Sequence, residues 1–126
     1  MMKTSYLALA LLALTTLSSS ALEAPKEPAS ALKVLLDATQ NKDLEKFESV
    51  CNEVMQQAMT EETMAAVSQR FAEFLKQGYQ ACYMGSLDRK SVKTFYWKLD
   101  FKTDGRPDML AELSMKDGKV AGFFIR

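Results

Sequence analysis

The C-terminal stretch, residues 92–126, constrains the fold of this chain most strongly, because it reads as three successive β-strands joined by tight turns. The first strand alternates large apolar residues with more polar ones, and its apolar positions are Phe95, Trp97, Leu99 and Phe101. Successive side chains of a strand point to opposite faces, so this alternation is typical of a strand with one buried face. The next strand repeats the pattern with Met109, Ala111, Leu113 and Met115. We therefore expect an antiparallel sheet that packs one face against a core.

Tight turns separate these strands. Asp104-Gly105 and Asp117-Gly118 are both Asp-Gly pairs, which are strong signals for hairpin turns. A further strand is expected at residues 79–87, with Gly85 as a bulge or an early end. The sheet is therefore predicted to have four strands in a meander.

The last strand differs from the others because both of its faces are apolar. One face carries Val120, Gly122 and Phe124, and the other carries Ala121, Phe123 and Ile125. Such a strand is expected to be covered on both sides, either by its own chain or by a partner. A homodimer that meets the outer face of the sheet is one explanation, and its predicted interface is Tyr96, Leu110 and Phe123.

Three amphipathic helices are expected before the sheet. Ser30, Asp43 and Thr60 are the predicted N-caps, because their side-chain oxygens can accept hydrogen bonds from free amides of the first turn. Apolar residues then recur at helical spacing, and the second helix is expected to run without a break from Leu44 to Met55. Helices followed by antiparallel strands indicate an α+β domain.

The N-terminus has the features of a signal peptide. Lys3 gives a positive start, residues 6–17 form an apolar run, and Ser19 and Ala21 are small residues suited to a cleavage site. The apolar run is shorter than the roughly 20 residues of a membrane-spanning helix. We predict residues 1–21 as a cleaved signal, 22–29 as a flexible leader and 30–126 as a single domain. The product would be periplasmic or secreted without a stable membrane anchor, and a retained membrane tether is the alternative.

Charge and cysteine content limit the partners. Sixteen basic and 16 acidic residues balance, so no electrostatic case exists for nucleic acid as a partner. Two cysteines, Cys51 and Cys82, lie in the exported part, and pairing is a reasonable default for an even number in an oxidising compartment. We expect them to form a disulfide, with two unpaired thiols as the alternative.

The chain contains no histidine, which limits its chemistry. This excludes Ser-His-Asp and Cys-His nucleophilic sites and every metal site that needs imidazole. No glycine-rich phosphate loop is present either. We therefore predict no catalytic residue, no metal site and no cofactor.

The ending Leu-Ser-Met-Lys-Asp-Gly-Lys-Val-Ala-Gly-Phe-Phe-Ile, residues 113–125, resembles the nuclear transport factor 2-like superfamily. In particular, it is similar to small exported bacterial domains of unknown function. The stretch from Phe47 to Met55 also fits that family. The resemblance implies three helices packed on a curved, cone-like sheet of four antiparallel strands, with an apolar cavity at its wide end. It also implies that Gly122 relieves crowding at a strand bend. The family has no universal catalytic residues, so the resemblance assigns none here.

Aromatic residues supply a candidate ligand pocket, which we assign to Phe71, Tyr83, Phe95, Trp97 and Leu99. Aromatic residues in such a pattern more often simply fill a core, and this is the favoured alternative. The expected function is a non-enzymatic, exported domain that binds a small apolar ligand or associates through its sheet.

Two alternatives remain open. The first is an isomerase-like or hydratase-like enzyme with a buried carboxylate beside a tyrosine. Asp37, Asp100, Tyr79 and Tyr83 have the required chemistry. The second alternative is a partner-binding or inhibitor module.

Overall fold

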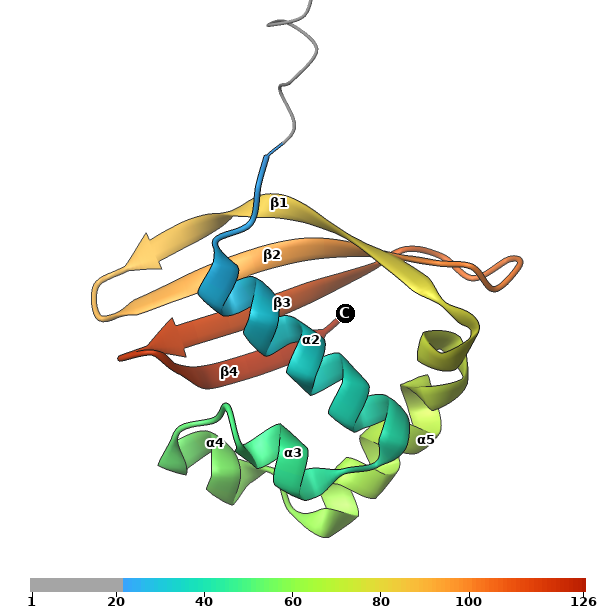
Figure 1. Cartoon of the computed structure of the whole chain (residues 1–126), viewed down its shortest axis with the longest axis horizontal. Coiled ribbons are helices and arrows are strands. Elements are labelled where there is room, and N and C mark those ends of the chain that lie inside the picture. The colour runs from blue at the N-terminus through green and yellow to red at the C-terminus, as the bar shows by residue number, and fades with distance from the viewer. Residues whose placement is uncertain (1–21) are drawn as a thin grey trace, which may run out of the picture.

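The computed structural model describes residues 22–126 and consists there of helices followed by a four-stranded sheet (Figure 1). The helices are α2 (Lys26–Asn41), α3 (Leu44–Glu48), α4 (Glu53–Ala58) and α5 (Glu61–Gln77). The strands are β1 (Tyr79–Arg89), β2 (Val92–Phe101), β3 (Met109–Lys116) and β4 (Lys119–Ile125). The predicted α+β class is therefore confirmed. The predicted signal peptide, residues 1–21, lies outside the described residues.

The first helix begins earlier than the sequence predicted. Helix α2 starts at Lys26 rather than after Ser30, so half of the predicted flexible leader is helical. The reason is the position of Pro28, which falls in the first turn of α2. Amides of the first turn have no partner within the helix, so the missing N–H of proline costs little there.

Two of the predicted caps are confirmed. The Asp43 side chain accepts a hydrogen bond from the Lys46 N–H at 3.1 Å, and the Thr60 hydroxyl accepts one from the Thr63 N–H at 3.1 Å. These bonds satisfy amides that the first turn leaves free, and they fix the starting points of α3 and α5.

The second predicted helix is broken in two, which corrects the expectation of a continuous helix. Helix α3 ends at Glu48, and Asn52 caps a separate helix α4 by accepting from the Met55 N–H at 2.9 Å. Between the two helices, Cys51 forms an isolated parallel bridge with Val120 of β4. The backbone at this point thus bonds to the sheet, which is incompatible with helical hydrogen bonding.

The sheet is an antiparallel meander in the order β1-β2-β3-β4. Gly85 lies at a bulge in β1, where the register shifts between Tyr83 and Gly85, and this confirms the predicted bulge. Its φ of 127° is a conformation that side-chain-bearing residues rarely adopt.

Helices α2 and α5 cover one face of the sheet, and the other face carries no helix of the described chain (Figure 1). The covered face holds the apolar residues that alternation predicted in β2. Phe95, Trp97, Leu99 and Phe101 are all buried, and they join Leu35, Leu36, Met64 and Phe71 in one hydrophobic cluster. The predicted inner face of β2 is therefore confirmed.

A second bulge changes the phase of β4. Met115 pairs with Val120, but Ser114 pairs with Gly122, so Ala121 is an extra residue between them. A strand that gains one residue turns every following side chain to the opposite face. Phe123 therefore shares the inner face with its partner Leu113, and Phe124 lies on the outer face.

Candidate functional site

The predicted pocket residues are mainly core residues. Phe71, Phe95, Trp97 and Leu99 are buried in the interior of the domain. Tyr83 is half-buried, and its ring lies 5.5 Å from that of Trp97. The structure thus brings Tyr83 and Trp97 together at the border of the core, where both residues line a groove.

This groove runs between α2 and β1 and has a volume of about 480 Å³. Of the predicted residues, only Tyr83 and Trp97 line it. The other lining residues come from the segment before α2, from α2 itself and from β1: Leu22, Ala24, Ala29, Leu32, Lys33, Leu36, Tyr79 and Ala81. We call this the α2–β1 groove. The helical stripe containing Leu32 and Leu36 was visible in the sequence, but nothing in it showed which strand it would face.

The α2–β1 groove combines an apolar floor with a few polar groups. Burial raises the pKa of the Tyr79 phenol above its usual value of 10.0, and the nearby Asp37 carboxylate raises it further. The Tyr79 phenol is protonated at neutral pH, as an unshifted tyrosine also is, and can donate a hydrogen bond. The Lys33 side chain is exposed at the rim and supplies a positive charge. Such a groove suits a ligand with an apolar body and one polar end.

The residues named for acid–base chemistry do not form a desolvated site. Asp37 is partly exposed, and its carboxylate lies 3.8 Å from the Lys46 ammonium. Asp100 is exposed on the outer face, opposite Gln80. Within residues 22–126 the buried polar side chains are Thr39, Ser68 and Thr94, and none is a carboxylate. An isomerase of the expected kind needs a carboxylate in apolar surroundings, and the described residues do not supply one.

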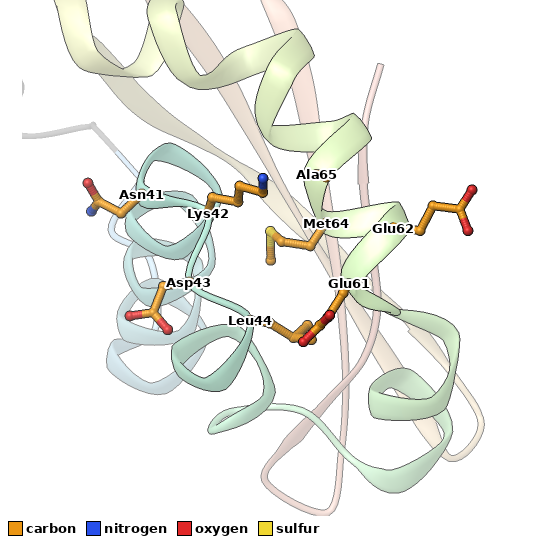
Figure 2. A pocket seen from close by; sticks show the side chains of 8 residues that line it. All are labelled: Asn41, Lys42, Asp43, Leu44, Glu61, Glu62, Met64 and Ala65. Carbon is orange, nitrogen blue, oxygen red and sulfur yellow. The ribbon is translucent and has the colours of Figure 1, made fainter.

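A second hollow is polar and lies between the end of α2 and the start of α5 (Figure 2). Its volume is about 700 Å³, and Met64 forms part of its wall. Figure 2 shows the Lys42 and Met64 side chains extending toward each other, while Glu62 is directed away. Asp43 caps α3, and the two glutamates that line the hollow, Glu61 and Glu62, lie in the first turn of α5. These acidic groups have structural roles at helix starts, so this hollow is a weak candidate for chemistry.

The described part of the chain holds no group of three acidic or thiol ligands that suits a metal ion.

A third hollow, of about 440 Å³, runs along the free side of β4. Helix α4 and the first half of α5 form one wall, and β4 forms the other. Its wall residues are almost all apolar: Val54, Met55, Ala58, Met59, Thr63, Val67, Ala121, Gly122, Phe123 and Phe124. We call this the β4 groove. Periodicity did not predict it, because it depends on the break between α3 and α4.

Of the three residues predicted for a sheet interface, two lie on the outer face and one does not. Tyr96 and Leu110 lie half-buried on the outer face, as expected. Phe123 instead points inward, where its ring lies 6.3 Å from that of Phe47. The extra residue at Ala121 reverses the phase of the strand, so Phe124 occupies the outer position predicted for Phe123.

The predicted disulfide is not formed. Cys51 and Cys82 are both free, and Cys51 is buried. Cys51 bridges to β4 at one edge of the sheet, while Cys82 lies in β1 at the other edge. Neighbouring strands are about 4.8 Å apart, so three strand spacings separate the edges by roughly 14 Å. A disulfide needs Cα atoms within about 7 Å.

The fold and its grooves define a small α+β domain whose hollows, within residues 22–126, are open to solvent. No family profile matches the chain, and no curated protein does. Among solved structures, it is similar to an uncharacterized cystatin fold protein from Novosphingobium aromaticivorans, with 15% sequence identity and a TM-score of 0.41. The match covers 77% of this chain and 95% of that one. Within residues 22–126, no helix has the length and apolar character needed to cross a membrane.

Proposed function

We propose that this domain is a non-enzymatic binding protein for a small, mainly apolar ligand, and that the α2–β1 groove is its site. The observation that supports this most is a groove of suitable size that is lined by the half-buried Tyr79 and Tyr83 and bordered by the buried Trp97. Ligand sites typically measure about 300–1,000 Å³, and this groove has about 480 Å³.

The lining also supports a ligand with one polar end. Leu32, Leu36 and Trp97 offer an apolar floor, and the protonated Tyr79 phenol offers a hydrogen-bond donor. Lys33 at the rim favours an acidic end group over a basic one. A fatty acid or an aromatic carboxylate has this chemistry. We expect the protein to act after export, once residues 1–21 have been removed.

Trp97 makes this proposal directly testable, because it is the only tryptophan in the chain. An anilinonaphthalene sulfonate probe is expected to gain fluorescence in the groove and to change the emission of Trp97. The substitution Ala81→Tyr fills the groove from β1, and we expect it to weaken probe binding by about tenfold or more. Unchanged Trp97 emission at saturating probe would contradict the proposal.

The matched control is Gln80→Tyr. Gln80 is exposed and precedes Ala81, but it lies on the outer face of β1, opposite Asp100. This variant adds the same ring to the same strand without filling the α2–β1 groove. Probe affinity is therefore expected to stay at the wild-type value. An equal loss in both variants would mean that the probe reports damage to β1 rather than occupation of the groove.

A second candidate function is self-association through the outer face of the sheet. Met84, Leu87 and Phe124 support it, since they are 57%, 47% and 56% exposed on or beside this face. Sedimentation of the wild type and of Leu87→Glu tests this candidate. A dimer that dissociates in the variant supports it, and a monomer at all concentrations contradicts it.

We also propose a relationship to the nuclear transport factor 2-like superfamily, with a cone-like curvature of the sheet. The order of helices before an antiparallel meander supports this, as does the Asp-Gly turn that leads into β4. The α2–β1 groove would then correspond to the open end of the cone.

A further inference from the structure

The first part of the free edge of β4 is already paired by the chain itself. The Val120 N–H donates to the Val50 carbonyl at 2.8 Å, and the Asn52 N–H donates to the Val120 carbonyl at 2.9 Å. Both backbone groups of Val120 thus point away from β3 and are satisfied by residues 50–52. This short segment acts as the beginning of a fifth strand, parallel to β4.

This pairing stops after one residue of β4. Asn52 becomes the cap of α4, so the chain turns away from the sheet at Glu53. Beyond this point, β4 continues for several residues to Ile125. The part of the edge that follows Val120 therefore has no strand beside it among residues 22–126.

The hydrogen-bond pattern between β3 and β4 fixes the direction in which the other backbone groups of β4 point. Leu110 and Arg126 exchange both of their backbone hydrogen bonds, at 2.7 and 2.9 Å. Because backbone groups alternate in direction along an antiparallel strand, Ile125 and Phe123 must point theirs away from β3. Outside the β3–β4 ladder, the backbone bonds found within residues 22–126 include none to Phe123 or Ile125.

The β4 groove lies beside these unpaired groups. Its wall contains no charged side chain, and Thr63 is its only residue with a polar one. Val54 and Phe124, on its two sides, are 71% and 56% exposed, so both walls of the groove present apolar side chains to solvent. The groove and the open edge therefore form one continuous surface with apolar walls and a row of backbone donors and acceptors.

We infer that an extended, uncharged segment of a partner protein binds in the β4 groove and adds to the sheet as a fifth strand beside Phe123 and Ile125. Only an extended segment can pair with these backbone groups, because a helix already uses its own. Alternate side chains of such a segment would enter the apolar groove, and the others would face solvent. The segment would continue the pairing that residues 50–52 begin at Val120.

The probe for this inference is a short peptide of alternating valine and threonine, with one lysine at each end for solubility and with both termini blocked. On adding it, we expect slower amide hydrogen exchange at Phe123 and Ile125, measured by NMR on the full mature chain. The control is the same peptide with alternate backbone nitrogens methylated, which removes its donors on one edge. It is expected to give no such protection.

Variants separate this surface from the rest of the molecule. Val54→Glu places a charge in the β4 groove at an exposed helix position, and we expect it to weaken peptide binding by about tenfold or more. Gln80→Glu adds the same charge at an exposed site in β1, at the opposite edge of the sheet, and should leave binding unchanged. Ala81→Tyr, which fills the α2–β1 groove, should also leave it unchanged, so this inference and the proposed ligand site fail independently.

Three results would overturn the inference. The first is the absence of protection at Phe123 and Ile125 when millimolar peptide is present. The second is equal binding of the methylated peptide, which would indicate apolar contact without strand pairing. The third is protection of the Phe123 and Ile125 amides that increases with protein concentration when no peptide is present, together with a dimer in sedimentation. A second copy of the chain would then occupy this edge.

Discussion

Phe47 and Phe123 pack their rings 6.3 Å apart, with 58° between the ring planes. Phe47 belongs to the short helix α3 and is almost fully buried. The contact ties α3 to the last strand and extends the inner face of the sheet to its β4 edge. It exists only because the bulge at Ala121 turns Phe123 inward.

The first prediction tests this inward position of Phe123. Phe123→Ala is expected to lower the free energy of unfolding by about 2–4 kcal/mol, because it removes the partly buried ring that packs against Phe47. Phe124→Ala, at the exposed neighbouring position, should cost at most about 1 kcal/mol. Urea unfolding of the two variants measures the difference. A larger loss of stability in Phe124→Ala than in Phe123→Ala would mean that Phe124, and not Phe123, points into the core, as in a strand without a bulge.

The second prediction concerns the two thiols. At mildly alkaline pH without reductant, the folded protein should react with a thiol reagent at Cys82, which is half-buried, and not at Cys51, which is buried. The Cys51 S–H also donates to the Phe47 carbonyl at 3.2 Å. Alkylation followed by mass spectrometry counts the modified sites. Both thiols should react after unfolding, and a protein that needs reductant for any labelling would contain the disulfide after all.

The third prediction is a loss of stability at alkaline pH. Burial raises the pKa of the Cys51 thiol from its ordinary value of 9.0 to about 11, and the Glu48 carboxylate contributes in the same direction. The folded state therefore keeps a proton that the unfolded state loses as the pH rises above 9. The contribution of the protonated Cys51 thiol to the free energy of unfolding is fully present below pH 9, decreases as the pH rises, and is lost by about pH 11. The total loss is roughly 2–3 kcal/mol.

Urea unfolding at pH 8 and pH 10.5, with reductant present, measures this loss. In Cys51→Ala, the free energy of unfolding should fall less between pH 8 and pH 10.5 than in the wild type. Its value at pH 8 will be lower than that of the wild type, because the buried side chain is lost. Cys82→Ala is the control and should keep the wild-type decrease. In every variant the free energy of unfolding should still fall somewhat between these two pH values, because the pKa of Tyr79 is also raised. Identical pH profiles for the wild type and Cys51→Ala would disprove the assignment to Cys51.

Local sequence signals predicted much of this fold because they depend on near neighbours in the chain. The caps at Asp43 and Thr60 and the alternation in β2 are properties of a few adjacent residues, and the structure confirms them. The break between α3 and α4 could not be predicted in this way. Its cause is the bond between Val50 and Val120, which are far apart in sequence.

The candidate sites were harder to predict for the same reason. Alternation identified Trp97 as inward-facing, but it could not show that this residue also lines a groove beside α2. The β4 groove depends both on the helix break and on the extra residue at Ala121. A bulge leaves no periodic signal when both faces of a strand are apolar, and this is why Phe123 and Phe124 exchanged roles.

The fourth prediction compares two glycines. Gly118 has a φ of 77° in the hairpin turn, and a Cβ there would lie 3.2 Å from the Glu27 carboxylate. Gly118→Ala should therefore cost about 1 kcal/mol. A Cβ at Gly122 would meet the Ser114 side chain at 3.6 Å, an ordinary contact, so the expected crowding at this strand bend is not present. Gly122→Ala should change stability by less than about 0.5 kcal/mol, and thermal unfolding of both variants checks the contrast.

The loop between β2 and β3 is held against the end of α5 by several contacts. The Lys102 N–H donates to the Gly78 carbonyl at 3.0 Å, and the Thr103 hydroxyl donates to the Gln77 side chain at 2.6 Å. Arg106 then places its guanidinium 4.0 Å from the centre of the Phe74 ring. A cation at this distance from an aromatic ring is attracted to its face.

The fifth prediction is that this cation–π contact between Arg106 and Phe74 couples the loop to α5. Arg106→Met keeps most of the apolar side-chain volume and removes the charge, while Phe74→Leu keeps an apolar side chain and removes the ring. In a double-mutant cycle, the coupling free energy should be about 0.5–2 kcal/mol. It should depend little on salt, because Arg106 is partly buried and its Nε atom is shielded from solvent. A coupling near zero would mean that the backbone bond at Gly78 and the Thr103–Gln77 bond hold the loop without help from the ring.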